Sequence, residues 1–481
     1  MARSIENTQS TIKIFRKNIF YAFSAQGISL VLSVIMALVV PKVMGIEEFS
    51  YWQLFLFYSG YSGFFHFGLN DGIYLREGGT NYNKLNTKLI GTQFRVSFLF
   101  HCILSVVVIV SSLIIIEDSS RSFVWIATAI SLPLINAISF IGYIFQAVNQ
   151  TKIYSLSVIL DKVIFIIAIL VLLLLQYDDF FWFVVLYLCS KIFSLLYCIW
   201  KGRQIVFSQT LKLKSVFKEI SINISVGINL MFSNIASLLV LGNGRFIVDK
   251  VWGITTFGTI SFALLLTNFF LTFIAQISMV LFPALRQTDE IQLKRFYYIS
   301  RDILGVVLAG FLLSYMPLNY ILDLWLPQYK ESLQYLALLL PLCTYEGKMN
   351  LLCTTYFKVL RKEKLLLKIN LMSLMISVIM SVIGGYVFKN IYVVVISMVV
   401  AVAIRSIISE IYLAKLMEAK ILKDIVIETL LVLSYIACTW YISPIAGFIT
   451  YLIFYVIYLL ISRQKIAVIL KTIKNVSEKN L

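Results

Sequence analysis

The sequence has few charged residues and few of the residue types on which catalytic and metal centres depend. Only 14% of its 481 residues are charged, and it contains just two histidines, seven prolines and six cysteines. Two histidines, His66 and His101, leave almost nothing from which to build a His-based catalytic or metal site. The sequence also lacks a nucleotide-binding P-loop, which argues against direct ATP hydrolysis. We therefore expect neither an enzyme nor a bound metal or cofactor.

Neither the cysteines nor the positive net charge indicates a catalytic site, a metal site or a nucleic-acid partner. All six cysteines lie in apolar segments, where they pack as small hydrophobic residues, and their spacing indicates neither a disulfide framework nor a metal site. The net charge is +17, but the sequence predicts no soluble basic domain that could bind nucleic acid, so a nucleic-acid partner is not expected. Membrane topology and attraction to anionic lipid headgroups explain most of this charge.

Hydrophobic residues dominate the sequence. They make up 60% of it, and a mean hydropathy of +0.89 leaves too few polar residues to cover a soluble protein of this length. Apolar runs of about 20 residues are long enough for helices to cross a bilayer. The sequence therefore predicts an all-α polytopic membrane protein with about fourteen transmembrane helices. The predicted segments are 18–41, 49–69, 93–116, 122–145, 155–175, 179–200, 219–241, 256–282, 303–322, 332–357, 366–388, 391–413, 424–441 and 445–462.

The distribution of basic residues predicts the orientation of these helices. Most of the 41 Lys and Arg fall in alternate loops on the side of the N-terminus, and basic residues collect on the cytoplasmic side of a membrane. Both termini are therefore expected in the cytoplasm. The loops predicted on the opposite side are short and leave no room for an external domain.

A repeated motif predicts two like halves. Val40–Ile46 (VPKVMGI) returns about 208 residues later as Val248–Ile254 (VDKVWGI), and Leu132-Pro133-Leu134 similarly matches Leu340-Pro341-Leu342. Repeats of this size are typical of transporters built from two like halves. The predicted organisation is a six-helix lobe over 1–205, a second over 206–418 in parallel pseudo-twofold repeat, and an extra helix pair with a basic tail over 419–481.

Three charged residues lie deep in predicted helices. Lys191 falls in the sixth segment, and Glu346 and Lys348 fall in the tenth. Charge inside a bilayer persists where it lines a wet cavity or has a partner. The lysines could form a cationic site for a phosphate-bearing or acidic substrate, with Glu346 tuning the charge or binding a coupling ion. Alternatively, Glu346 neutralises Lys191 or Lys348 and joins helices.

Further charged residues lie near the ends of predicted helices. Their side chains contact either substrate or lipid headgroups, and the basic ones are also expected there from topology alone. On the cytoplasmic side they are Arg76, Arg95, Asp161, Lys162, Arg286, Lys358 and Arg405. On the outer side, Arg245 and Asp249 form either a gate or a solvated hairpin. The two histidines are either buried structural groups or proton relays.

Several segments carry a resemblance to a known family. They are FFHFGLNDGIYLREGG (Phe64 to Gly79), GRFIVDKVWGITTFGTISFA (Gly244 to Ala263), LFPALR (Leu281 to Arg286), LDLWLPQY (Leu322 to Tyr329) and TTYFKVLRKEKLL (Thr354 to Leu366). Together they resemble Wzx-type polysaccharide flippases of the multidrug/oligosaccharidyl-lipid/polysaccharide exporter (MOP) superfamily. Part of the first segment is also similar to a loop of major-facilitator transporters, which leaves that superfamily as a further alternative.

The resemblance implies a function and a set of roles. It implies alternating access that moves an undecaprenyl-pyrophosphate-linked oligosaccharide across the bacterial inner membrane for O-antigen, lipopolysaccharide or capsule synthesis. It implies membrane lipids, a polysaccharide polymerase and chain-length machinery as partners, and a lipid-tail groove at the extra helix pair, as in lipid II flippases. The implied cavity cations are Arg76, Lys191, Arg286 and Lys348; Glu346 and Asp161 would tune charge or coupling; and Arg95, Lys162, Arg245, Asp249, Lys358 and Arg405 would form the mouth or gate.

The sequence leaves two other functions open. A cation-coupled multidrug exporter of the same superfamily should have an acidic, aromatic cavity, whereas two of the three deepest charges here are lysines. An O-antigen polymerase should carry large external loops, which the sequence does not predict.

Overall fold

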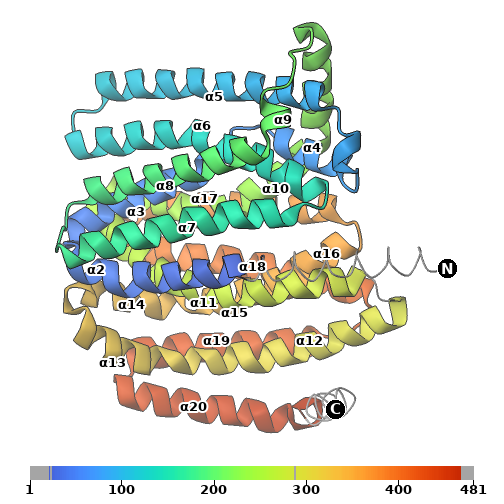
Figure 1. Ribbon diagram of the computed structural model, residues 1–481. Helices are drawn as coiled ribbons and strands as arrows, with labels where there is room; N and C mark the ends of the chain where they lie inside the picture. The colour runs from blue at the N-terminus through green and yellow to red at the C-terminus, as the bar shows by residue number, and fades with distance from the viewer. Residues whose placement is uncertain (1–20, 22–23, 287–288, 467–481) are drawn as a thin grey trace. The chain divides into compact units, whose positions relative to one another are not determined.

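The computed structural model is all-helical, with no strand among the residues that it describes, namely 21, 24–286 and 289–466 (Figure 1). Side chains are described except at 273 and 275–286. In these residues, eleven helices are long and apolar enough to cross a membrane. Helices suit a bilayer because each backbone N–H and C=O is paired within its own segment. The predicted all-α polytopic class is therefore confirmed.

Three of the fourteen predicted segments are not among these eleven helices. The continuous helix predicted over 49–69 is wrong, because α3 (Ile46–Ser62) ends before a turn in which Phe67 and Gly68 have φ angles of 51° and 87°. Such left-handed backbone cannot continue an α-helix. The segment 332–357 is broken at Leu340, next to Pro341, and the segment 424–441 forms the 20-residue α19. The count of fourteen stays a prediction.

The chain forms two compact units, Met1–Ile235 and Ala236–Leu481, and the boundary falls within α10 (Leu213–Trp252). The predicted division at 205/206 stays a prediction. Besides the first part of α10, the elements of unit 1 are η1 (Ile35–Val39), α2 (Val40–Val43), α3, α4 (Leu69–Glu77), η2 (Tyr82–Lys84), α5 (Thr87–Ile115), α6 (Ser119–Ala147), α7 (Thr151–Leu174), α8 (Phe180–Lys201) and α9 (Arg203–Val206).

Helix α6 lies at the centre of unit 1, packed against α3, α4, α5, α7 and α8. It contains Pro133 in its interior, and its N-terminus is capped by Asp118, whose carboxylate accepts from the amides of Ser120 and Arg121. Trp52 of α3 is fully buried and packs against the ring of Phe165 from α7. The core of unit 1 is therefore built from aromatic and aliphatic residues on several helices.

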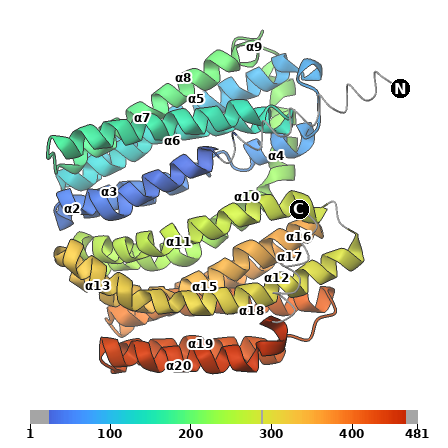
Figure 2. The same ribbon diagram turned by 60° about the horizontal axis from the view of Figure 1, so that its bottom comes forward.

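Unit 2 contains more broken helices than unit 1. After α10, its elements are α11 (Ile254–Arg286), α12 (Glu290–Phe311), η3 (Leu312–Ser314), α13 (Tyr315–Trp325), η4 (Pro327–Tyr329), α14 (Lys330–Leu339), α15 (Pro341–Lys348), η5 (Met349–Thr354), α16 (Thr355–Val359), α17 (Glu363–Val382), η6 (Ile383–Val387), α18 (Ile391–Leu416), α19 (Leu422–Tyr441) and α20 (Pro444–Ile461). Helices α19 and α20 lie side by side and both contact α12 (Figure 2).

The repeated motif occupies the same structural position in both units. In unit 1, α2 ends at Val43 and α3 begins at Ile46; in unit 2, α10 ends at Trp252 and α11 begins at Ile254. Gly253 has a φ angle of 88°, which a glycine adopts without strain. The motif therefore marks a tight connection between two helices in each unit.

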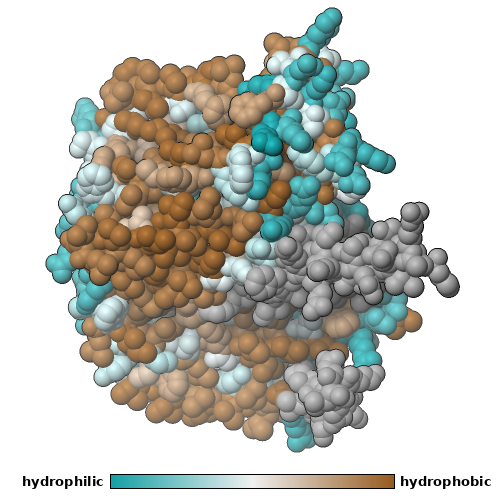
Figure 3. Space-filling view, viewed as in Figure 1, coloured by the Kyte–Doolittle hydropathy of each residue, from teal (hydrophilic) through white to brown (hydrophobic). Residues whose placement is uncertain are grey.

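The surface is hydrophobic along the helices and hydrophilic at their ends. Figure 3 shows brown surface over α5, α7 and α8, with teal residues gathered at the helix ends. On α5 the exposed side chains include Leu99, Ile103, Val106 and Ile114, which are 57–77% exposed. A soluble protein does not expose an apolar face of this extent. This surface is suited to contact with lipid.

Candidate functional site

The deep cation of unit 1 is paired with an acid on the neighbouring helix. Lys191 of α8 places its Nζ 2.6 Å from Oδ2 of Asp161 on α7, and the Ser190 hydroxyl donates to Oδ1 of Asp161 at 2.9 Å. The Lys191 ammonium also lies 4.7 Å from the ring centroid of Tyr187. The side chains of Lys191 and Asp161 are only 13% and 10% exposed. The pair therefore neutralises charge that would be costly to bury alone.

The deep cation of unit 2 belongs to a larger cluster. Lys348 of α15 contacts Glu428 of α19 closely and lies 3.3 Å from Oε2 of Glu410 on α18. Arg301 of α12 donates to the same two acids, from Nε to Glu410 at 2.9 Å and from Nη2 to Glu428 at 3.2 Å. All four side chains are at most 6% exposed. We call Arg301, Lys348, Glu410 and Glu428 the four-charge cluster; its formal charges cancel.

A second set of ionic contacts extends this cluster toward a more exposed edge. Nη1 of Arg301 lies 3.3 Å from Oδ2 of Asp424 and 3.5 Å from Oδ1 of Asp302. Lys465, which follows α20, contacts the same acids at 2.6 Å and 3.4 Å. We call Asp302, Asp424 and Lys465 the rim of the cluster. Because the contacts come from α12, α19 and the end of α20, they connect the C-terminal helix pair to the rest of unit 2.

Glu346 has a different partner from the two considered in the sequence. Neutralisation of Lys191 or Lys348 by Glu346 is not observed; its carboxylate contacts Arg405 of α18 instead. Arg405 also donates from Nη1 to the Ser237 hydroxyl at 2.7 Å, and its side chain is fully buried. One turn of α15 thus presents Glu346 to one cation while Lys348 meets two acids.

Arg76 is the most accessible of the predicted cavity cations whose side chains are described. It lies at the end of α4, with its side chain 37% exposed, and Nη1 donates to Glu219 at 2.9 Å and Asn223 at 2.6 Å on α10. A Cβ on Gly72 would collide with the backbone of Asn223, so this glycine permits the close approach of α4 and α10. Arg76 is therefore held in a fixed direction while part of its guanidinium stays accessible.

The remaining predicted residues lie in several different places. Arg95 donates from Nη1 to the carbonyls of Val206 and Ser208 at 2.9 and 2.7 Å, which fixes the chain after α9. Arg245 donates to the Ser261 hydroxyl, and Asp249, four residues later on α10, is buried. Lys162 is half-buried on α7, and Lys358 is exposed on α16. Arg286 ends α11, but its side chain lies outside the described residues.

Both histidines are buried near the break between α3 and α4. Nδ1 of His66 accepts from the Gly68 amide at 2.9 Å, and Nε2 of His101 donates to the Phe65 carbonyl at 3.1 Å. His66 also lies 3.8 Å from the buried carboxylate of Asp71. Both rings therefore contribute hydrogen bonds to an irregular stretch of backbone, as expected for structural histidines.

Sequence reasoning missed three members of the four-charge cluster: Arg301, Glu410 and Glu428. A signal was available, since Glu410 and Glu428 are acids inside predicted apolar segments, as Lys191 and Lys348 are basic residues inside them. Arg301 falls just before the predicted segment 303–322, whereas α12 begins at Glu290 and places it within the helix. In the part of the chain that the structure describes, no group of three or more His, Cys, Asp or Glu could hold a metal ion.

Comparisons with known proteins give a family and a fold. Residues 15–289 match the family model described as "Polysaccharide biosynthesis protein". The solved structure of "Lipid II flippase MurJ, inward closed conformation" is similar over 93% of this chain and 99% of that one, at 13% identity and a TM-score of 0.63. An inward-facing multidrug resistance MATE family transporter of the MOP superfamily is similar over 80% and 94%, at 13% identity and a TM-score of 0.59. No curated protein matches.

Proposed function

Because the chain belongs to the polysaccharide biosynthesis protein family, we propose that it is a flippase for an undecaprenyl-pyrophosphate-linked oligosaccharide repeat unit. The cargo moves from the cytoplasmic to the outer leaflet of the bacterial inner membrane by alternating access, and supplies O-antigen or capsule synthesis. The observation that carries this proposal is the family match combined with a fold shared with a lipid II flippase over 93% of the chain.

Arg76 is the first contact that we propose for the pyrophosphate. Nη1 is engaged by Glu219 and Asn223, and among the described residues none accepts from Nη2 or Nε. Arginine presents several N–H groups in a rigid fork that matches phosphate oxygens. Because two contacts fix its direction before cargo arrives, little side-chain entropy is lost on binding. The same geometry would suit a second anionic group, such as an acidic sugar.

We propose that Lys191 and Lys348 contact the phosphate only after their carboxylate partners have been displaced. Each is bound to carboxylates, so a phosphate has to displace an acid before it can contact the ammonium. In unit 1 this acid is Asp161, and protonation or movement of its carboxylate would release Lys191. This is the charge-tuning role that we propose for Asp161.

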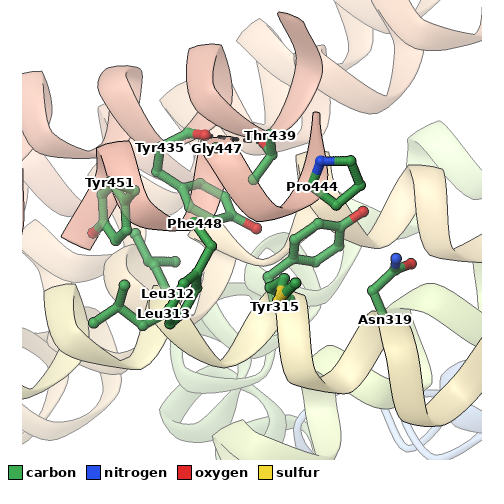
Figure 4. Close-up of a pocket in the computed structure, with 11 residues that line it drawn as sticks. Leu312, Leu313, Tyr315, Asn319, Tyr435, Thr439, Pro444, Gly447, Phe448 and Tyr451 are labelled. Atoms are coloured by element: carbon green, nitrogen blue, oxygen red, sulfur yellow. Dashed lines mark hydrogen bonds between the residues drawn. The ribbon is translucent and has the colours of Figure 1, made fainter. Parts of the chain in front are cut away.

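The polyprenyl tail needs an apolar path, and unit 2 has one candidate at the extra helix pair. A small pocket of about 50 Å³ lies between the segment following α12 and helices α19 and α20 (Figure 4). Leu313, Tyr315 and Phe448 are among the residues that line it. Isoprenoid chains are uncharged hydrocarbon, so burial of each methylene-sized group against such a surface contributes about 0.8 kcal/mol. We propose that this pocket is part of the tail groove.

Deletion of the gene tests the function directly. Loss of a flippase should strand single lipid-linked repeat units on the cytoplasmic face and abolish surface polysaccharide, whereas loss of a polymerase still allows one unit to be exported. A drug exporter would instead change drug susceptibility and leave the polysaccharide intact. Surface polysaccharide that is normal in the deletion strain would contradict the proposal.

A charge exchange tests the role of Lys191. The double variant D161K/K191D keeps an ion pair between α7 and α8 but moves the cation to the other helix. If Lys191 contacts cargo, export should fall while expression and thermal stability stay close to the wild-type protein. If the pair only joins the helices, the exchange should restore export that K191D alone loses. Restored export would remove Lys191 from the site.

A further inference from the structure

An apolar pocket bordered by lysines lies where α18 turns into α19. Its volume is about 400 Å³, and the apolar part of its lining includes Ile411, Ala414 and Leu422. Lys415, Lys420 and Lys423 also line it, and all three are exposed. None of these residues belongs to the four-charge cluster or to the predicted cavity cations. The pocket thus combines a hydrocarbon surface with three positive charges at one end of the helices.

The acids nearest to these lysines in sequence are occupied by other cations. Glu418 accepts from Lys294 of α12 at 2.9 Å. Asp424 contacts Arg301 at 3.3 Å and Lys465 at 2.6 Å. Among the described residues, no carboxylate lies within ion-pair distance of Lys415, Lys420 or Lys423. The lysines therefore present positive charge that is not paired with any carboxylate in the described part of the chain.

The turn that carries the lysines is fixed by its own hydrogen bonds. The amides of Met417 and Ala419 donate to the carbonyls of Leu413 and Ala414 at 2.9 and 2.8 Å, and Glu418 adopts a φ angle of 57°. Ala414 also packs with Ile421 and Ile425 in a small buried cluster beneath the pocket. The pocket is therefore formed before a ligand binds, which lowers the entropy cost of binding.

We propose that this pocket binds an anionic phospholipid from the adjoining leaflet, with its phosphate on the lysines and an acyl chain on the apolar surface. Basic pockets at the ends of transmembrane helices attract anionic headgroups, and each Lys near the surface strengthens that attraction. A free phosphate would use the lysines alone, whereas a lipid also covers Ile411 and Leu422, which are 40% and 66% exposed. The pocket shares no residue with the proposed cargo contacts or the proposed tail groove, and the proposal does not depend on the proposed function.

Lipid titration of the full-length purified protein, followed by native mass spectrometry, tests the proposal. The probe is phosphatidylglycerol, with phosphatidylcholine for comparison. The triple variant K415Q/K420Q/K423Q should bind phosphatidylglycerol roughly 100-fold more weakly than the wild-type protein, because each of the three lysines strengthens binding of an anionic headgroup about fivefold. The matched control is K212Q/K214Q/K218Q, which removes the same charge from exposed lysines on either side of the start of α10. It should bind like the wild-type protein.

Three results would overturn the proposal. Equal loss in the two triple variants would mean that net charge, and not this pocket, attracts the lipid. Equal binding of phosphatidylcholine would mean that the lysines do not select the headgroup. Competition by inorganic phosphate as effective as that by the lipid, with no weakening in L422Q, would assign the site to free phosphate. L422Q alters only an exposed side chain, so its effect can be read without loss of the fold.

Discussion

The two units bury charge in different ways. Unit 1 holds Lys191 in a single pair with Asp161, supported by one serine hydroxyl. Unit 2 also has a single pair, Glu346 with Arg405, but in addition it holds four charges from α12, α15, α18 and α19, and each acid of this cluster contacts two cations. Both residues of an ion pair can be replaced together without leaving a buried charge unpaired. Replacing one residue of the four-charge cluster leaves other buried charges without a counter-charge. The cluster therefore joins four helices of unit 2, whereas the unit 1 pair joins two.

This junction has a particular consequence for the C-terminal helices. Oε2 of Glu428 on α19 contacts both Arg301 and Lys348. The Tyr458 hydroxyl of α20 lies 3.5 Å from Oε1 of the same carboxylate. The carboxylate of Glu428 thus connects the extra helix pair to both α12 and α15, in addition to the contacts of the rim with α12. If the pair guides the lipid tail as proposed, this connection sets the position of the groove.

The largest effect is expected for R301M. The substitution removes one buried cation from contact with Glu410 and Glu428 and leaves Lys348 alone to balance both acids. Breaking a buried ionic contact by removing one partner costs about 3–5 kcal/mol, because a charge is left uncompensated. Unfolding of the purified protein in mixed detergent micelles measures the loss. An R301M protein as stable as the wild-type protein would show that the cluster is solvated and not a junction.

The second-largest effect is expected for K348M, which tests whether the four charges form one network or independent pairs. K348M should destabilise unit 2 by about 3 kcal/mol, for the same reason as R301M. Adding E428Q should recover part of this loss, about 1–2 kcal/mol, because Arg301 and Glu410 then form a balanced pair. A double-mutant cycle from the same unfolding assay gives the coupling energy. Strictly additive losses would contradict the network.

A smaller effect is expected at the unit 1 pair. K191M leaves only Asp161 without its cation, and Ser190 still donates to that carboxylate, so the cost should be about 1–3 kcal/mol. K191M/D161N should be close to wild-type stability, since no charge then remains buried. A loss for K191M larger than that for R301M would reverse the comparison between the units.

The sequence predicted the membrane class and the position of most helices because long apolar runs have few alternative structures. It also located Lys191 and Lys348 as buried charges, because a lysine inside an apolar run is conspicuous. It did not predict the break after Ser62, although Gly63 and Gly68 lie there, because Phe64, Phe65 and Phe67 continue the run of aromatic residues that begins in the helix.

The partners of the buried charges were not predictable in the same way. Glu346 and Lys348 lie two residues apart, so they face different neighbours on a helix, and which neighbour carries the opposite charge depends on packing. Arg405 and Glu410, five residues apart on α18, meet Glu346 and Lys348 respectively. Tertiary packing, not sequence spacing, decides these pairings.

The smallest effect is expected at the rim. Lys465 is 37% exposed, and Arg301 still contacts Asp302 and Asp424 when the Lys465 ammonium is removed. K465Q should therefore cost less than about 1 kcal/mol, as exposed ion pairs do. The loss should shrink further between 50 and 500 mM salt, because salt screens exposed charges more than buried ones. A salt-independent loss as large as that of R301M would place the rim inside the junction and extend the network to the end of α20.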